Sequence, residues 1–362
     1  YFTSSRPQTP EGNTKVLQTG NDNTVAISKK ATPFINDIYF WRQEGGVRGA
    51  AIKRPAGTEF AAATFTPDGS RMYFTAWKTE DVVKKYEIWT TSKRSDNTWG
   101  DPVTVSTTLN GSGNNKQPFV TPDGKFIVFA SDRSGGMGRY DLWYAPLRSD
   151  GTTGQATHMG NTINSAGDEE APYYNAVSKK LRYSSNGMVG MGGFDFFESR
   201  GDFVSWAKPV NMGYPFNSSK DDIYFTSTNA IGSEGYISSD RESLCCLELF
   251  AVKMETITIK GVLTDCKTEK PVPNATVSLN SAEDSYTATT DDMGMYLFKV
   301  ASRKPVTLKF EATGYFAKSV NYTTGELARA DTLITADNCI TPFKVNVPIV
   351  LKNIYFEFNS AE

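Results

Sequence analysis

The residues with the greatest potential for chemistry are paired carboxylates, in the clusters Asp168-Glu169-Glu170 and Asp221-Asp222. A glycosidase holds two carboxyls about 5 to 9 Å apart across a sugar, and a calcium site combines carboxylates with carbonyls. Both clusters, however, precede a repeated strand, and another copy of the repeat has Asn115-Lys116-Gln117 in the same place. We therefore expect these carboxylates to bond neighbouring backbone or to line a central channel. The channel-lining candidates are Asp168, Glu169, Asp221 and Asp222.

Other catalytic constellations are missing from the sequence. His158 is the single histidine, and no Gly-x-Ser-x-Gly elbow supplies a nucleophile for it. The glycine-rich run from Gly187 to Gly193 lacks the lysine and the following helix of a phosphate-binding loop. We predict that the chain is not an enzyme, with no catalytic residues and no cofactor.

Metal sites have little support in the sequence. Asp291, Asp292 and Gly294 form a turn that could bind calcium, but a plain turn capped by an aspartate side chain is the favoured interpretation. A zinc site is not expected, since the chain has one histidine and no Cys-x-x-Cys spacing. We predict no metal site, with Asp291 and Asp292 as weak calcium candidates.

Four cysteines, Cys245, Cys246, Cys266 and Cys339, allow three pairings. An even number in a strand-rich chain fits disulfides in an oxidising compartment, and buried thiols are the alternative. We favour a bond from Cys266 to one of the vicinal pair, across the predicted domain junction.

A repeat of about 54 residues determines the predicted fold. An aromatic-apolar run ending in small polar residues recurs five times. The equivalent positions Phe74, Phe129, Tyr183 and Ile237 are separated by 55, 54 and 54 residues. A second signature, an acidic residue before an apolar pair, keeps the same spacing at Asp37, Glu87, Asp141, Asp195 and Glu248. Because the acidic residues are in phase with the repeat, we expect them to have an architectural hydrogen-bonding role.

Each repeat contains four short strands, which is the size of a propeller blade. In the third copy we predict strands at 117–121, 126–131, 141–147 and 155–159. Turn sequences such as Thr66-Pro67-Asp68-Gly69 and Thr121-Pro122-Asp123-Gly124 provide fixed and positive φ angles between strands. We predict an all-β fold with a five-bladed β-propeller at residues 1–254, whose first blade is incomplete at Tyr1 and interrupted before Asp37.

Glycine- and methionine-rich hairpins between the second and third strands of two blades could form a partner-binding rim. They occupy equivalent places near residues 134–138 and 187–193. The flexible-hairpin interpretation is favoured, but exposed methionines suit adaptable protein contacts. The partner-binding candidates are Ser134, Gly135, Met137, Met188 and Met191.

From Thr256 the pattern changes to about seven short alternating strands, typical of a transthyretin- or immunoglobulin-like β-sandwich, which we place at residues 255–352. The final run from Ile354 to Ser360 begins another element within residues 353–362. Because Tyr1 opens inside a strand-like run, we interpret both ends as cut from a longer chain, so a missing signal peptide indicates no compartment.

Charge and hydropathy exclude two kinds of partner. The net charge of the 362 residues is −2, and no run of lysine and arginine gives a nucleic-acid footprint. No apolar run approaches the roughly 18 residues that a membrane helix needs. We therefore expect neither nucleic-acid binding nor a direct membrane span.

Three segments resemble known families. The Thr-Pro-Asp-Gly turns and the Asp141-Leu142-Trp143 strand resemble the TolB-related propeller repeat. Gly261-Val262, Pro271-Val272-Pro273-Asn274-Ala275 and Gly314-Tyr315 resemble the carboxypeptidase regulatory-like domain, a family without catalytic residues of its own. The last residues look like the entry strand of an OmpA-type peptidoglycan-binding domain.

This combination is similar to outer-membrane-associated periplasmic proteins of Bacteroidota, in particular an anchor lipoprotein of the type IX secretion system. The resemblance implies a non-catalytic scaffold in the periplasm that contacts outer-membrane or secretion-system proteins. Peptidoglycan would be bound only through the remainder of the C-terminal domain. The alternative is a carbohydrate-binding or glycan-acting propeller.

Overall fold

The computed structural model describes residues 1–7, 17–19, 25–27, 34–42, 46–229, 232–243, 246–281, 285–300, 305–327, 331–336 and 338–343. The chain divides into two compact units, Tyr1–Lys253 and Met254–Glu362. In the described part, strands dominate and the two helices, α1 (Thr107–Asn110) and α2 (Thr324–Leu327), have four residues each. No helix in these ranges is long and apolar enough to cross a membrane.

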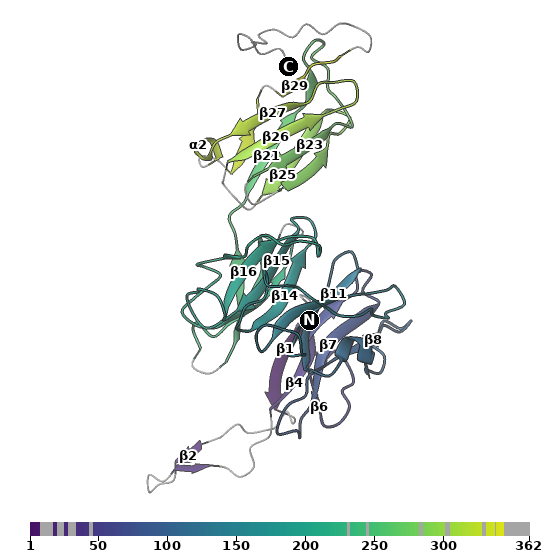
Figure 1. The fold of residues 1–362 in the computed structure, drawn as a ribbon, viewed down its shortest axis with the longest axis vertical. Helices are drawn as coiled ribbons and strands as arrows, with labels where there is room; N and C mark the ends of the chain where they lie inside the picture. Colours follow the sequence, from purple (N-terminus) through teal and green to yellow (C-terminus); the bar gives the residue numbers. More distant parts are fainter. Residues whose placement is uncertain are drawn as a thin grey trace, which may run out of the picture. The chain divides into compact units, whose positions relative to one another are not determined.

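The first unit is a series of antiparallel sheets whose strands follow one another in sequence (Figure 1). Three of the sheets have four strands and two have three. The first strand of each sheet, called its inner strand below, contacts the first strand of the next sheet. This arrangement is propeller-like, and each sheet is called a blade below. Blade 1 contains β1 (Phe2–Pro7), β4 (Phe34–Arg42) and β5 (Gly46–Ala50). Blade 2 contains β6 (Thr58–Phe65), β7 (Arg71–Lys78), β8 (Glu87–Ser92) and β9 (Val103–Thr104).

The remaining blades repeat this order. Blade 3 contains β10 (Asn115–Val120), β11 (Phe126–Ser131), β12 (Asp141–Pro146) and β13 (Thr157–His158). Blade 4 contains β14 (Glu169–Asn175), β15 (Lys180–Ser185), β16 (Asp195–Arg200) and β17 (Val210–Asn211). Blade 5 contains β18 (Asp222–Ser227), β19 (Glu234–Ser239) and β20 (Glu248–Lys253). The predicted strands of the third repeat are confirmed to within two residues.

The predicted interruption of the first blade before Asp37 contains a short hairpin of β2 (Leu17–Thr19) and β3 (Val25–Ile27). The turns of the repeat form as their sequences predict. The Gly69 amide donates to the Thr66 carbonyl at 2.8 Å, with φ of 67° at Gly69. The Asp68 carboxylate accepts from Thr66 Oγ1 at 2.6 Å, and this bond together with those from Ser70 lowers the pKa of Asp68 to about 2.

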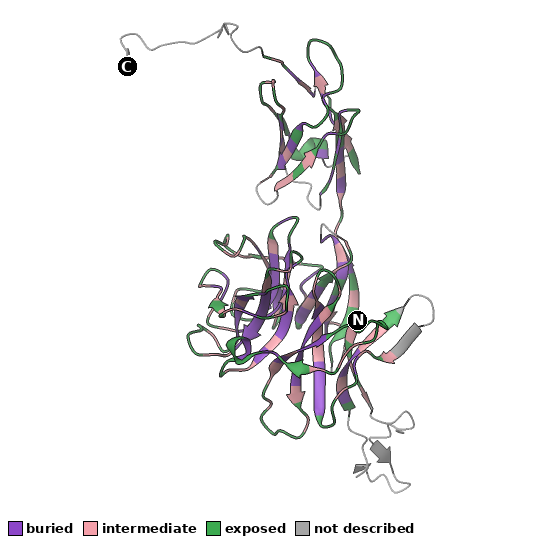
Figure 2. Ribbon diagram, turned by 90° about the vertical axis from the view of Figure 1, so that its right-hand side faces the viewer, coloured by how far each residue is buried: buried purple, intermediate pink, exposed green. Residues whose placement is uncertain are grey.

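Apolar residues from neighbouring blades bury one another. One cluster joins Tyr73 and Ile88 of blade 2 to Ile127 and Phe129 of blade 3, and a second joins blades 3 and 4 through residues including Leu142 and Tyr183. Figure 2 shows that buried positions lie mainly along the strands and exposed ones mainly in the connections. The core of this unit therefore lies between blades, as expected when both faces of each sheet are apolar.

The second unit is a β-sandwich around one core that includes Ile259, Leu279, Phe298 and Phe310. One sheet has the order β25-β21-β28, another the order β24-β23-β26-β27, and β22 pairs with β29. The strands are β21 (Ile257–Val262), β22 (Thr264–Asp265), β23 (Thr276–Asn280), β24 (Ser285–Thr289), β25 (Met295–Val300), β26 (Val306–Glu311), β27 (Lys318–Tyr322), β28 (Thr332–Ile334) and β29 (Cys339–Ile340). Residues 353–362, predicted to start a further domain, lie outside the described residues.

Candidate functional site

Two hairpins of the same design present methionines in blades 3 and 4. Met137 lies between β11 and β12 and Met191 between β15 and β16, each flanked by glycines and 54 residues apart. In the first hairpin, Asp141 Oδ2 accepts from the Met137 and Gly138 amides at 3.0 and 3.2 Å. In the second, Asp195 Oδ2 accepts from Met191 N at 2.7 Å and Gly192 N at 3.0 Å. In blades 3 and 4 the repeated acidic residue thus holds the hairpin backbone, the hydrogen-bonding role that its spacing predicts. The equivalent residues differ, since Glu87 accepts from Trp89 Nε1 at 3.3 Å and Glu248 is exposed.

The same hairpins press against the connection that enters the next blade. A Cβ added to Gly138 would overlap the Gly167 carbonyl, and one added to Gly192 would overlap the Lys220 carbonyl. Glycine is required at Gly138 and Gly192 because two backbones approach closely and leave no room for a side chain. A positive φ angle is not the reason at these two positions. Each hairpin is therefore clamped at one place, Met137–Gly138 or Met191–Gly192, by an aspartate on one side and by the next connection on the other.

Most of the predicted rim residues are exposed. Met137 and Met191 expose 50% and 53% of their surface, and Ser134 and Gly135 are also exposed. Met188 is different, since it is partly buried against the apolar core between blades 3 and 4. Sequence reasoning missed three exposed aliphatic side chains in equivalent connections, namely Val82, Val83 and Val189.

The acidic clusters contribute mainly to the fold. The Asp168 carboxylate accepts from Tyr140 N at 3.0 Å and forms an ion pair with Arg139 at 2.6 Å. Glu169 has no exposed surface and accepts from the hydroxyls of Ser165 and Ser185 at 2.5 and 2.6 Å. Burial raises the pKa of Glu169, although these hydrogen bonds oppose the rise.

The second cluster is organised in the same way. Asp222, at the start of β18, has no exposed surface and accepts from Ser218 N and Oγ at 2.6 and 2.8 Å, with Arg241 at 2.6 Å on its other oxygen. Asp221 is exposed and accepts from Phe194 N at 2.9 Å. Glu169 and Asp222 therefore face the interior of their own blades and not an open channel.

The carboxylate that reaches neighbouring inner strands is Glu170, one position beyond the predicted residue. Its oxygens contact Lys116 Nζ at 2.7 Å and Gln117 Nε2 at 2.8 Å. Gln117 Nε2 also donates to the Tyr224 hydroxyl at 2.8 Å, and Gln117 Oε1 accepts from Ala171 N at 2.9 Å. Burial raises the pKa of Tyr224 to about 12. These contacts, called the axial cluster below, link β10, β14 and β18.

A repeated bulge positions the axial cluster. The inner strands of blades 2 to 5, which are β6, β10, β14 and β18, each have one residue with positive φ at the place where the register shifts. Such a bulge turns side chains that would otherwise alternate in and out, which explains why the clusters could not be assigned to a face from a period of two. The four bulge residues are Ala62, Gln117, Ala171 and Tyr224.

Three asparagines form a second set of repeated contacts that sequence reasoning missed. In blade 3, the Asn164 side chain accepts from Leu142 N at 2.7 Å and donates to Leu142 O at 3.1 Å. Asn110 makes the same pair of bonds to Ile88, and Asn217 makes it to Phe196. An apolar residue followed by asparagine recurs at steps of 54 and 53 residues, a signal that was present in the sequence.

The contacts of His158 with the described residues include no nucleophile. Its Nε2 lies 2.9 Å from Asn164 Nδ2 and 3.5 Å from Asp141 Oδ1, and its Nδ1 accepts from Gly160 N at 3.2 Å. The ring also contacts Trp143, with 4.8 Å between ring centroids. These contacts hold the outer strand of blade 3 against its neighbour.

In the turn considered as a calcium site, backbone amides bind the Asp291 carboxylate. Asp291 Oδ1 accepts from Met293 N and Met295 N at 2.9 and 2.8 Å, and Gly294 N donates to the Asp291 carbonyl at 2.9 Å. Asp292 is exposed. In the described ranges no group of three or more histidine, cysteine or acidic side chains is arranged to hold a metal ion.

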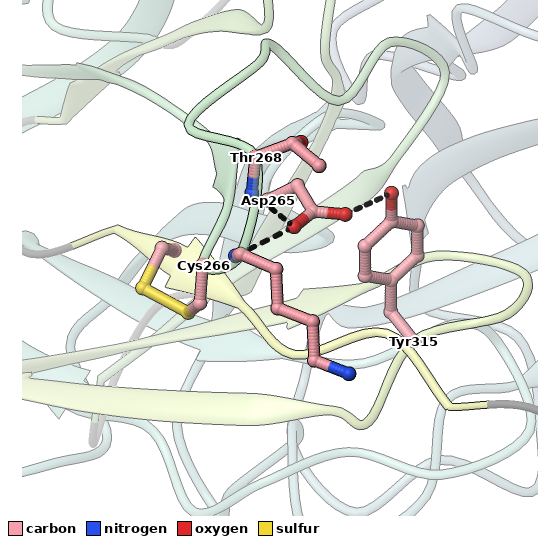
Figure 3. Close-up of a disulfide and its surroundings, with 6 residues drawn as sticks. Asp265, Cys266, Thr268 and Tyr315 are labelled. Atoms are coloured by element: carbon pink, nitrogen blue, oxygen red, sulfur yellow. Dashed lines mark hydrogen bonds between the residues drawn. A yellow bond between two sulfur atoms is a disulfide. The ribbon is translucent and has the colours of Figure 1, made fainter.

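The cysteine pairing differs from the favoured one. Cys266 is bonded to Cys339, with a Cα separation of 4.9 Å (Figure 3). The reason is tertiary, because β22 pairs in parallel with β29 and brings Thr264 opposite Cys339. Cys246 is also disulfide-bonded, whereas Cys245 lies outside the described residues.

Around this disulfide, Asp265 organises the adjoining turn (Figure 3). Its carboxylate accepts from Lys267 N at 2.7 Å, from Thr268 N at 3.0 Å and from the Tyr315 hydroxyl at 3.1 Å. The backbone bond from Lys267 is the main reason that the pKa of Asp265 is lowered. The disulfide and this carboxylate together fix the end of the sandwich.

Comparison with known families supports the assignment of the second unit. Residues 258–335 match the carboxypeptidase regulatory-like domain, in agreement with the resemblance of its strands and turns. No curated protein sequence matches the chain.

Several solved structures are similar to the chain at low identity. A structure described as TolB from Agrobacterium tumefaciens is 19% identical over 52% of this chain and 61% of that one, with a TM-score of 0.34. An α-L-arabinofuranosidase from Lactobacillus brevis is 9% identical over 61% of this chain and 78% of that one, with a TM-score of 0.40. A puromycin-hydrolysing peptidase of Mycobacterium tuberculosis is 12% identical over 90% of this chain and 44% of that one, with a TM-score of 0.34.

The chain therefore spans less than two thirds of the TolB and peptidase structures. Because the TM-scores are 0.40 or below, these similarities carry no argument about what this chain does.

Proposed function

We propose that the chain is a non-catalytic protein-interaction module whose hairpins in blades 3 and 4 bind a partner protein. The observation that carries the proposal is the pair of clamped hairpins, in which Met137 and Met191 remain half exposed while the surrounding backbone is fixed. Polarizable, unbranched methionine side chains adapt to varied apolar surfaces, and a fixed backbone reduces the entropy lost on binding. The buried carboxylates at the blade starts are occupied by folding contacts and do not suggest catalysis.

The proposed setting is the periplasm, in association with the outer membrane. The chain would be the middle part of an anchor that connects a type IX-like secretion machine to peptidoglycan. A closed, five-bladed ring belongs to this proposal, as does an OmpA-type domain continuing from residues 353–362. The disulfide between Cys266 and Cys339 supports an oxidising compartment, and the carboxypeptidase regulatory-like match supports the domain combination.

The test is affinity capture from envelope extracts with the full chain and with Met137→Ser/Met191→Ser. The unchanged chain is expected to recover an outer-membrane or secretion component, and the double variant is expected to lose it. Met293→Ser is the matched control, since Met293 is 64% exposed but lies in the sandwich. Recovery of no such component by the unchanged chain, or equal recovery by the double variant, would contradict the proposal.

A second candidate function is glycan binding or hydrolysis at the axial cluster. It is favoured by one observation, the convergence of Glu170, Lys116 and Tyr224 from three inner strands. Incubation with a panel of polysaccharides would detect turnover, and Glu170→Gln is expected to abolish it if this function is correct. If the chain neither hydrolyses nor binds the polysaccharides but captures a partner protein, the result would favour the interaction module.

A further inference from the structure

The outer face of one sandwich sheet ends in a surface hollow of about 610 Å³, within the range of roughly 300 to 1,000 Å³ usual for ligand sites. Its floor contains a row of side chains in register across three strands, Asn280 of β23, Thr307 of β26 and Asn321 of β27. The neighbouring residues Leu279, Val306 and Tyr322 are buried in the core. The row therefore points away from the core, as strand alternation requires.

Two hydroxyls orient the asparagine amides of this row. Ser285 Oγ donates to Asn280 Oδ1 at 2.7 Å, and Thr307 Oγ1 donates to Asn321 Oδ1 at 2.7 Å. With each carbonyl oxygen occupied, the Nδ2 group of each asparagine has no partner among the described residues. Both asparagines are exposed, so two NH₂ donors are held ready at the hollow.

The spacing and charge of the hollow limit the ligand class. Because Asn280 and Asn321 lie on strands either side of β26, their backbones are separated by about 9 to 10 Å, a span that two linked sugar rings can bridge. None of the lining residues is charged at neutral pH; they are Asn280, Ser281, Pro305, Val306, Thr307, Asn321, Tyr322, Thr323, Thr324 and Gly325. Among these described residues an ionic ligand would find no counter-charge, whereas a ligand with many hydroxyl or carbonyl acceptors would be satisfied.

We propose that this hollow binds a neutral oligosaccharide, with the Asn280 and Asn321 amides donating to its hydroxyl or acetamido oxygens. The inference is independent of the partner-binding rim, since it concerns the sandwich alone. Because the described lining has no charged group and its one aromatic residue, Tyr322, is buried, the affinity should be modest, with a dissociation constant on the order of 1 mM.

The test uses the full chain, labelled with ¹⁵N and titrated with chitotetraose or maltotetraose while the side-chain amide signals of asparagine are monitored. The signals absent from Asn280→Ala and Asn321→Ala identify the two amides. Loss of one hydrogen bond should weaken binding about fivefold, and the double variant should weaken it further. Thr287→Ala is the matched control because Thr287 lies on the same face, one row from the hollow.

Saturable shifts at both amides, reduced in the asparagine variants and retained in Thr287→Ala, would support the proposal. Response to chitotetraose alone would assign recognition to the acetamido carbonyl, and response to both sugars would assign it to hydroxyls. No shift at about ten times the expected dissociation constant, or equal binding by the double variant with unchanged thermal unfolding, would overturn it.

Discussion

At the scale of single residues, the acidic side chains of the propeller-like unit replace backbone partners. Asp141 and Asp195 accept amide hydrogens from hairpins that cannot form regular ladder bonds. A buried amide without an acceptor is costly, so these carboxylates are needed for folding even where they resemble catalytic groups.

Replacing Asp195 by alanine should destabilise the chain by about 1 to 3 kcal/mol, because the Met191 and Gly192 amides lose their acceptor. Urea unfolding measures the change. Asp81→Ala serves as control, since Asp81 is exposed in the equivalent connection of blade 2. Equal stability of the two variants would show that the carboxylate does not hold the hairpin.

Close backbone approach gives a second residue-scale prediction. Gly138→Ala and Gly192→Ala should each cost about 1 to 3 kcal/mol of unfolding free energy, since the new methyl group overlaps a carbonyl of the next blade. Gly325→Ala should have little effect, because the nearest atom to an added Cβ there is 3.9 Å away. A loss below about 0.5 kcal/mol for both hairpin variants, the usual size of a surface change, would contradict the clamped geometry.

At the scale of elements, ion pairs between adjacent strands join blade 4. Glu198 of β16 contacts Lys180 Nζ at 2.8 Å and Arg182 Nε at 2.7 Å, both on β15. Arg182 continues to the Gly232 carbonyl at 2.7 Å and lies 4.5 Å from the centre of the Phe225 ring in blade 5. The strand pair is thus connected to the next blade through one guanidinium.

This network predicts a pH dependence. Burial opposes ionisation of Glu198, but Arg182 and Lys180 outweigh it and hold the pKa of Glu198 below its ordinary 4.5. A carboxyl with a lowered folded-state pKa stabilises the fold above the unfolded pKa, and this contribution is lost as pH falls through the folded value. Thermal unfolding should therefore show a loss of stability below about pH 4.5 that is smaller in Glu198→Gln.

At neutral pH the same variant should be less stable by about 1 to 3 kcal/mol, because Lys180 and Arg182 lose a charged acceptor in a mostly buried site. Glu311→Gln is the matched control, since the Lys309–Glu311 pair is about half exposed on both sides and such pairs contribute little. Parallel acid unfolding curves for the wild type and Glu198→Gln would refute the assignment.

At the scale of the whole molecule, the two units have separate cores. The Cys266–Cys339 bond closes a loop within the second unit alone, at a sequence separation of 73. Independent cores of this kind usually unfold as separate cooperative units.

Cys266→Ala/Cys339→Ala should therefore lower one calorimetric transition, that of the sandwich, by about 2 to 5 kcal/mol. The transition of the propeller-like unit should keep its midpoint. The double variant is preferable to a reductant, because Cys246 is also disulfide-bonded. Equal shifts in both transitions would mean that the units do not unfold independently.

Much of the fold could be predicted because the sequence repeats the same strand and turn signals about every 54 residues. Strands β11 and β12 begin where the aromatic and acidic signatures place them, since local propensity and burial agree at each copy. Which carboxylate contacts the neighbouring inner strand could not be predicted. The register breaks at bulge residues such as Gln117 and Ala171, and Glu170, which was not among the predicted residues, makes the contacts to Lys116 and Gln117.

The sequence by itself determined the all-β class, the repeated blade and the position of the methionine hairpins, because these depend on periodicity and turn chemistry within about 54 residues. The tertiary structure alone decided which carboxylates point between blades, that Cys266 pairs with Cys339, and that Asn280 and Asn321 share one row. Those features depend on register between strands far apart in the chain, and a shift of one residue reverses every side chain.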